Sequence, residues 1–151
     1  MSGLISDEAK AWIGKSAAPE RLEVNRSDII KYSIATEQKQ EKYLSGDEAP
    51  PMFLFGLLRP LGRMESLTPD GLVPDSFVPE LPLKRVMAGG TTMKMHRAVK
   101  PGDVLIAKKS LKDMFEKSGS TGALIFVVYE LTIETEAGEP VLTEHQKRIF
   151  R

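Results

Sequence analysis

The fold is decided by residues 86–151, which read VMAGGTTMKMHRAVKPGDVLIAKKSLKDMFEKSGSTGALIFVVYELTIETEAGEPVLTEHQKRIFR. Residues 92–96 alternate between polar and apolar side chains, as a half-buried strand does. Residues 124–129 are apolar on both faces, which is typical of a central strand covered on both sides. Short turn-forming segments separate the apolar runs at residues 101–103, 118–122 and 136–139. The stretch therefore predicts four consecutive strands joined as an antiparallel meander.

Length and composition bound the class of protein. The 151 residues suit one domain, 1–151, and 41% hydrophobic side chains are enough for a core of ordinary size. The 21 basic and 21 acidic side chains cancel, so net charge gives no reason to expect binding to nucleic acid or to an anionic membrane. The apolar runs are too short to span a bilayer and the first residues lack a signal-peptide pattern, which favours the cytoplasm.

The residue types exclude several kinds of chemistry. Cysteine is absent, which excludes disulfides, thiolate catalysis and zinc sites of the cysteine type. The chain has two histidines, His96 and His145, which are too few for a histidine-based metal cluster. We therefore expect no metal site, and we expect His145, between Glu144 and Gln146, to be structural.

The N-terminal half predicts short helices, one edge strand and a long irregular segment. Ser6 can cap a first short helix, and residues 20–25 alternate as an edge strand. A second helix is predicted over residues 29–37. Residues 38–48 are mostly polar, which indicates an exposed turn or mobile loop, and residues 59–83 hold five prolines and should be irregular.

Residues 52–58, MFLFGLL, are apolar all round and follow two prolines. Such a segment is typical of a buried helix. Gly56 would let a strand or a ligand approach closely. A core helix without ligand contact is the alternative, and the sequence leaves both interpretations open.

The run from His96 to Leu105, HRAVKPGDVL, together with residues 115–119 and 124–127, resembles the hot-dog fold of MaoC-like dehydratases. Residues 49–53, 67–71 and 87–90 extend the resemblance, which spans most of the chain from Trp12 onward. Within that family the chain is most similar to the N-terminal half of double hot-dog hydratases such as mesaconyl-CoA (3-methylfumaryl-CoA) hydratase, a domain type also similar to the dehydratase of type I fatty acid synthase. The resemblance implies an α+β hot-dog fold, an antiparallel sheet wrapped around a central helix.

The residues that carry the family's chemistry are missing from this chain. Hydratases of the family carry an Asp-x-Asn-Pro-(aliphatic)-His loop after the second helix, and its Asp and His activate water for addition to an enoyl thioester. This chain instead has ATEQKQEK at residues 35–42. Glu37 or Glu41 could substitute, but a polar helix end favours solvated carboxylates. Hydration needs a positioned acid and base. His96 is a further, weak catalytic candidate, and a solvent-facing or interface histidine is the alternative.

The resemblance also directs attention to residues that could hold the substrate. Two adjacent glycines allow close backbone approach, so their amides could hold a thioester carbonyl or a pantetheine amide; equally, they could form a β-bulge. Coenzyme A carries phosphates with which a lysine can pair. The candidate substrate- and CoA-binding residues are Pro51, Phe55, Met87, Gly89, Gly90 and Lys100. No cofactor is expected, because the CoA thioester is the substrate.

Three functions fit these observations. The first is a subunit of a MaoC-type enoyl-CoA hydratase or 3-hydroxyacyl-CoA dehydratase, which binds the acyl thioester while a partner hot-dog subunit supplies the Asp and His. The second is a non-catalytic acyl-CoA binding module, and the third a hot-dog thioesterase, against which the acid-free residues 52–58 argue. In double hot-dog hydratases the segment that matches residues 142–151 leads into a second, catalytic domain. We therefore expect a separate catalytic hot-dog subunit as partner, with a self-dimer as the alternative.

Overall fold

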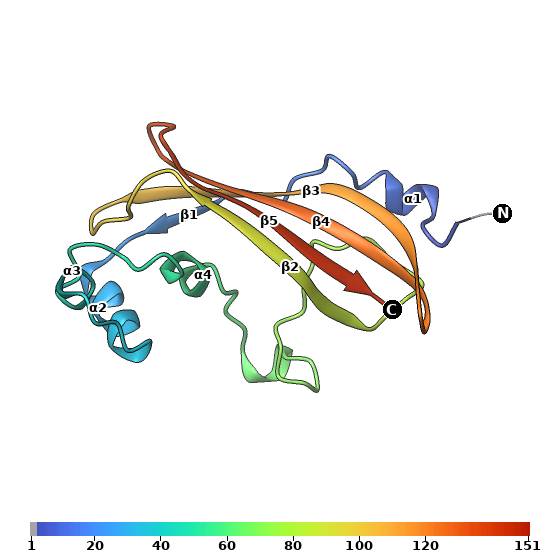
Figure 1. The fold of residues 1–151 in the computed structure, drawn as a ribbon, viewed down its shortest axis with the longest axis horizontal. Coiled ribbons are helices and arrows are strands. Elements are labelled where there is room, and N and C mark those ends of the chain that lie inside the picture. Colours follow the sequence, from blue (N-terminus) through green and yellow to red (C-terminus); the bar gives the residue numbers. More distant parts are fainter. Residues whose placement is uncertain (1–2) are drawn as a thin grey trace.

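A curved five-stranded antiparallel sheet dominates the structure, a computed structural model that describes residues 3–151 (Figure 1). Its strand order is β1-β3-β4-β5-β2. The strands are β1 (Glu20–Glu23), β2 (Val86–Met95), β3 (Val104–Gly119), β4 (Gly122–Thr135) and β5 (Pro140–Phe150). The four strands expected in the C-terminal half are therefore present, and β1 is the edge strand expected near residue 20.

The predicted meander is confirmed for three strands and wrong for the fourth. Strands β3, β4 and β5 pair in sequence, but β2 pairs with β5 at the far edge and has no pairing with β3. The chain between β2 and β3 is not a hairpin turn, because Val99 is buried in the core and its carbonyl accepts a hydrogen bond from the Ala49 N–H at 2.8 Å. The connection through Val99 therefore runs from β2, at one edge of the sheet, to β3, which lies next to the opposite edge strand β1.

Strand β4 lies at the centre of the sheet, as predicted, but only one of its faces is covered. Ile125, Val127 and Tyr129 point to the buried inner face. Phe126 lies on the outer face, where its ring stacks on that of Phe115 with centroids 5.1 Å apart. The expectation that this strand is covered on both sides is therefore wrong.

Two groups of side chains form the core on the inner face. Beneath one end of the sheet lie α2 (Arg26–Ala35), α3 (Glu41–Leu44) and α4 (Phe53–Leu57) (Figure 1). At the other end, α1 (Asp7–Lys10) and residues 77–83 contribute side chains that pack on the inner face of β3 and β4. The helix-side cluster comprises Val24, Ile29, Ala49, Phe53, Leu54, Val99, Leu105, Ala107, Ile133, Val141 and Leu142. The N-terminal cluster comprises Ile5, Ala9, Leu81, Leu111, Met114, Ile125, Val127, Tyr129 and Phe150.

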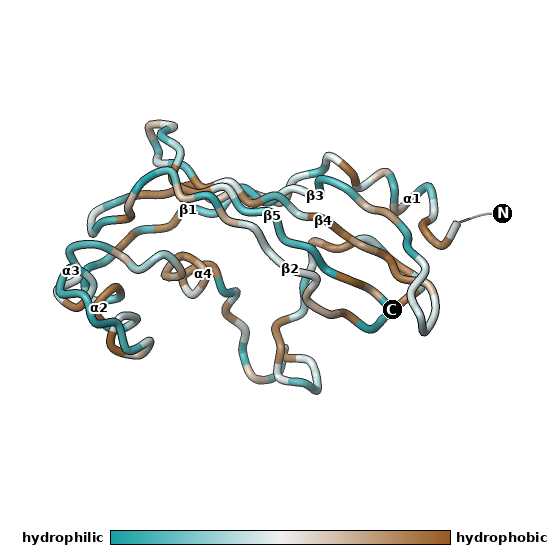
Figure 2. Tube along the Cα trace, viewed as in Figure 1, coloured by the Kyte–Doolittle hydropathy of each residue, from teal (hydrophilic) through white to brown (hydrophobic). Residues whose placement is uncertain are grey.

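The helices differ in part from the sequence expectation. The apolar segment forms α4, brown along most of its length in Figure 2, but Phe53 and Leu54 are buried while Met52 and Phe55 are exposed. The predicted loop at residues 38–48 contains α3, and the side chain of Tyr43 on this helix is buried. Burial of one aromatic ring against the body thus orders a segment whose composition is that of a loop.

The long connection from α4 to β2 is irregular, as predicted, apart from the 3-10 turn η1 (Met64–Ser66). Its second half is fixed to the sheet. The hydroxyl of Tyr129 donates to the Phe77 carbonyl at 3.0 Å, and the Phe77 ring lies 6.1 Å from the Tyr129 ring. Asp75 accepts from the Phe77 N–H at 2.9 Å.

Candidate functional site

A hollow of about 240 Å³ lies where β2 ends and the chain leaves the sheet. One wall is the segment that follows β2, and the other is the segment between α3 and α4. The backbone hydrogen bond from Ala49 to Val99 ties the two walls together. The lining residues are Tyr43, Glu48, Ala49, Pro51, Met95, His96, Arg97 and Ala98. Two residues singled out from the sequence, Pro51 and His96, thus meet in one site.

His96 is held on the outer face of the sheet edge. Its Nε2 lies 2.9 Å from the hydroxyl of Thr143 on β5, and its backbone N–H donates to the Val141 carbonyl at 2.8 Å. Within residues 3–151 no carboxylate contacts the imidazole ring. A histidine base is normally oriented by a hydrogen bond that fixes its tautomer, and a freely rotating hydroxyl does this poorly. This geometry alone does not make an acid–base pair.

The acids near the hollow are engaged elsewhere or exposed. Glu48 lies in the wall, but its carboxylate binds the ammonium of Lys42 at 3.0 Å. Glu37 and Glu41, which the sequence offered as substitutes for the missing dyad, are both exposed. Neither is hydrogen-bonded to His96 in the part of the chain that the structure describes.

A histidine–carboxylate pair does occur on the outer face. His145 Nε2 lies 2.7 Å from Glu130 Oε2, and Lys112 donates to the same oxygen at 2.6 Å. Hydrogen bonds from Lys112 and then His145 hold the pKa of Glu130 below its usual range. The three side chains lie on neighbouring strands and form a cross-strand network, so the structural role expected of His145 fits its position.

The paired glycines lie towards the other end of β2. The register with β5 shifts between Ala88 and Gly90, which makes Gly89 part of a β-bulge. A Cβ on Gly89 would lie 2.9 Å from Ile149, and Gly90 has φ +114°, which disfavours other residues. The bulge alternative is therefore confirmed. At about 3.3 Å per residue, Gly89 and His96 are on the order of 20 Å apart, so they do not share one hollow.

The remaining candidates lie outside the hollow. Met87 is exposed on β2. Phe55 is 51% exposed on α4, with the Arg59 guanidinium 5.5 Å from its ring centroid. Lys100 is exposed in the β2–β3 connection, where its N–H donates to Asp103. Contact of these residues with a ligand stays a prediction.

The sequence shows Lys109 and Arg148 as members of two basic clusters, which favours solvated side chains, but the structure places both on the inner face. Lys109 Nζ lies 4.5 Å from the centroid of the Tyr129 ring and 3.6 Å from Asp75, and Arg148 contacts both of the same groups. Burial lowers the pKa of Lys109 and raises that of Tyr129 to about 12. Burial also raises the pKa of Asp75, but hydrogen bonds from Phe77 and Arg148 and the charge of Lys109 outweigh it, so this pKa lies below its usual range.

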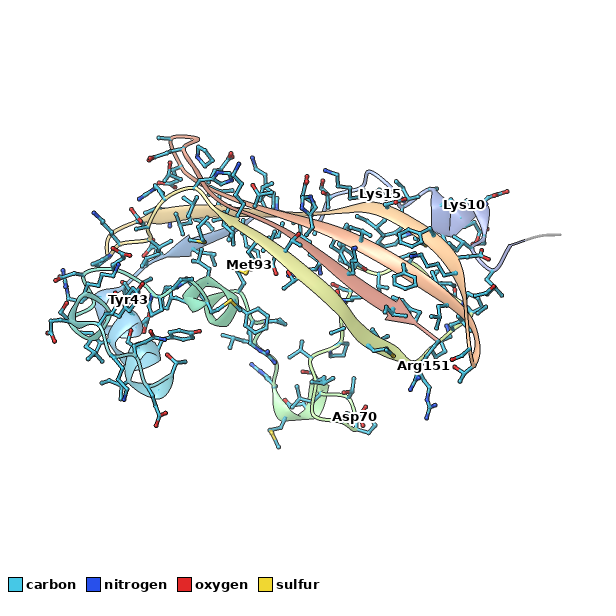
Figure 3. All side chains as sticks on the ribbon, in the orientation of Figure 1. Lys10, Lys15, Tyr43, Asp70, Met93 and Arg151 are labelled. Carbon is cyan, nitrogen blue, oxygen red and sulfur yellow. The ribbon has the colours of Figure 1, made fainter. Side chains whose placement is uncertain are left out.

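The buried carboxylate of Glu144 was also missed. It lies on the inner face of β5 and accepts a hydrogen bond from Thr91 Oγ1 at 2.7 Å. The sequence contained a signal for this burial. Alternate residues of a strand point to the same face, so Glu144 faces the same way as the inward-facing Leu142 and Phe150. Figure 3 shows the neighbouring Met93 on β2 beside α4.

The two edges of the sheet differ in a way that bears on assembly. The β1 edge has four residues, follows Pro19 and carries Glu20, Arg21 and Glu23. The β2 edge has ten residues, one charged side chain, Lys94, and exposed apolar side chains at Val86, Met87 and Met95. Short, charged edges resist pairing with another strand, whereas long, uncharged ones invite it. Among residues 3–151 nothing pairs with the outer edge of β2.

None of the helices in the described range is long and apolar enough to cross a membrane. Residues 3–151 contain no group of three or more histidine and acidic side chains placed to hold a metal ion.

Solved structures with the same architecture include two mycobacterial complexes and a longer enzyme. Similarity to a chain of the (3R)-hydroxyacyl-ACP dehydratase complex HadBC of Mycobacterium tuberculosis covers 97% of this chain and 99% of that chain, with 15% identity and TM-score 0.67. Similarity to a chain of the ChsH1-ChsH2 complex of the same organism covers 89% and 88%, with 17% identity and TM-score 0.66. A MaoC-like dehydratase is matched over 94% of this chain but 43% of its own, with 19% identity and TM-score 0.70.

These likenesses show the hot-dog fold that the sequence predicted. Among curated proteins none matches the sequence significantly. The model of the family described as FAS1-like, dehydratase domain region, matches residues 11–144, and the chain therefore belongs to that family.

Proposed function

We propose that this chain is the acyl-thioester-binding subunit of a MaoC-type hydratase or dehydratase and that it pairs through β2 with a separate, catalytic hot-dog subunit. The observation that carries the proposal is the free edge of β2 next to a hollow without an acid–base pair. The edge needs a partner strand, and the chemistry needs groups that the hollow does not contain.

The position of the hollow supports a shared site. It lies at the end of β2, so a subunit that extends the sheet across this edge would stand beside His96 and Pro51. An Asp and a His from that subunit could then face a thioester held by this chain. The match to 43% of a longer MaoC-like dehydratase is what one half of a double hot-dog enzyme would give.

The similar structures also favour a partner of the same fold. HadBC and ChsH1-ChsH2 are named as complexes, and heteromeric pairing of this kind would supply the missing dyad here. The finer resemblance, to the N-terminal half of mesaconyl-CoA hydratase, stays a hypothesis about the acyl group. The cytoplasmic location, the coenzyme A thioester as substrate and the absence of a further cofactor also stay predictions.

Co-expression with a MaoC-like hot-dog protein that retains the Asp-x-Asn-Pro-(aliphatic)-His motif tests the proposal. We expect a co-purifying complex that hydrates crotonyl-CoA, while the isolated chain turns over little or not at all. Loss of one positioned acid or base lowers the rate by about 10²–10⁴-fold. The matched control is the partner with its motif Asp changed to Asn, which should keep the complex and lose the activity.

Two results would overturn the proposal. Robust turnover by the isolated chain, abolished by His96→Ala, would mean that this chain carries its own catalytic group. A stable homo-oligomer that gains neither partner nor activity on mixing would favour the acyl-CoA binding module, since the free β2 edge also suits a second copy of the chain.

A further inference from the structure

Glu144, in the middle of β5, is unusual among the buried side chains. It is 6% exposed, and apart from tyrosines Ser33 is the one other polar side chain in the described range that is buried to a similar degree. On the inner face it lies between Leu131 of β4 and Met93 of β2, which are its direct cross-strand neighbours. Both neighbours pack against the helix-side cluster. The carboxylate therefore sits at the border of the apolar core beneath α4.

This carboxylate has few hydrogen-bond donors. Thr91 Oγ1 lies 2.7 Å from Oε1, and the same hydroxyl lies 3.2 Å from the His145 carbonyl. A hydroxyl has one hydrogen, so Glu144 receives at most one hydrogen bond from it. No donor of residues 3–151 contacts the second oxygen, Oε2, and that oxygen is not sealed from solvent.

Other shielded carboxylates of this chain have cationic partners. Asp103 binds the Arg97 guanidinium at 2.8 Å, and Asp75 binds Lys109 and Arg148. Glu144 has no such ion pair among the described residues. A buried carboxylate with a single shared donor is a cost to stability, and one free oxygen leaves it able to accept from a ligand.

The place of Glu144 connects it to the free edge. Thr91 is exposed on β2, directly after the bulge at Gly89 and Gly90, and pairs with Gln146 on the same inner face. Met95 lines the hollow, and Met93 and Thr91 follow it along the inner face of β2. A ligand chain that leaves the hollow along this face would pass Met93 and then the Thr91–Glu144 pair. A ligand that fits this path has an apolar chain, which contacts the apolar side chains, and one hydrogen-bond donor, which reaches Glu144.

We propose that Glu144, oriented by Thr91, accepts a hydrogen bond from an O–H or N–H group of the bound acyl thioester. The inference rests on the proposed function and adds that the ligand must carry a hydrogen-bond donor at this position. The donor is either a hydroxyl on the acyl chain or an amide N–H of the pantetheine arm. An acyl group that ends in a carboxylate is disfavoured at this position, because two anions would repel each other with little solvent between them.

Calorimetric titration of the full chain, with its partner subunit where one co-purifies, tests the inference. The probes are butyryl-CoA and 3-hydroxybutyryl-CoA, and the variants are Glu144→Gln and Thr91→Val. Glu134→Gln is the control, because Glu134 is a β4 carboxylate on the outer face, paired with Lys108. We expect Glu144→Gln to weaken binding by about tenfold or more, as loss of a charged hydrogen bond does, with Tm unchanged or raised and with no effect of the control.

The probes separate the two sources of the donor. If the acyl hydroxyl is the donor, the wild type prefers 3-hydroxybutyryl-CoA and Glu144→Gln removes the preference. If the pantetheine amide is the donor, Glu144→Gln weakens both thioesters equally. Should Glu144→Gln fail to fold, Thr91→Val is the second variant, because Thr91 is exposed. It should change the affinities for the two thioesters in the same direction as Glu144→Gln, by a smaller factor.

Failure of the Glu144 inference can be distinguished from failure of the proposed function. Thioesters that bind the wild type, Glu144→Gln and Thr91→Val equally well would overturn the inference and leave the proposed function standing. A wild type that binds neither thioester, with or without a catalytic partner, would overturn both.

Discussion

Replacing Asp75 with Ala should release the long connection from the sheet. The carboxylate accepts from the Phe77 N–H at 2.9 Å, binds Arg148 and lies 3.6 Å from Lys109. Its side chain is 31% exposed, so these contacts are partly shielded from water. Without Asp75, two cations remain over the Tyr129 ring with no anion between them. The N-terminal cluster that Phe77 covers should loosen with the connection.

The magnitude follows from the contacts that are lost. Hydrogen bonds to charged groups contribute about 1.5–3 kcal/mol, and leaving shielded cations unpaired adds to the loss. A decrease of about 2–3 kcal/mol in the free energy of unfolding corresponds to a fall in Tm of roughly 4–12 °C for a domain of this size. Thermal unfolding followed by circular dichroism measures it. The matched control is Asp70→Ala, an exposed carboxylate in the same connection (Figure 3), which should leave Tm unchanged.

The pH dependence adds a second readout. The folded-state pKa of Asp75 lies below its usual value, so its contribution to stability is present above the unfolded-state pKa of about 3.9 and is lost as the pH falls through the folded-state pKa. The difference in Tm between the wild type and Asp75→Ala should therefore be full at pH 7 and shrink below about pH 4. A Tm difference under about 1 °C at pH 7, or one that grows on acidification, would refute this reasoning.

Three further predictions test the packing. Leu111→Ala, at a fully buried position on the inner face, should cost about 2–5 kcal/mol in denaturant unfolding. Phe126→Ala should cost clearly less, because its ring lies partly exposed on the outer face; equal costs would contradict the assignment of the two faces. Gly90→Ala should cost about 1–2 kcal/mol because φ is +114°, and an unchanged unfolding midpoint would contradict the bulge geometry.

The sheet was largely predictable because local pattern and local turns define it. Residues 124–129 form the centre of β4, and the turn-forming segments after β3 and β4 join neighbours in sequence. The pairing of β2 was not predictable in the same way. It depends on the burial of Val99 against a segment 50 residues earlier in the chain, and no local pattern reports such a contact.

In the candidate site, too, features that depend on local sequence were predictable and features that depend on the fold were not. His96 and Pro51 were singled out separately, and the fold brings them into one hollow. For Gly90 the sequence left two interpretations open, and the positive φ agrees with the one based on conformational preference, a β-bulge. Glu144 was missed because polar neighbours at Thr143 and His145 made β5 resemble an exposed strand, and only its parity with Leu142 places it inside.

Hydrogen exchange at β2 tests the central claim most directly. Amides of Val86–Met95 should exchange rapidly along the free edge in the isolated chain and slow markedly in the complex with the catalytic hot-dog subunit, because a partner strand then accepts or shields them. The amides of Glu20–Glu23 on the other edge, β1, should exchange at the same rate in both states. Protection that appears on β1 or on the outer face of the sheet, with β2 unchanged, would contradict pairing through β2.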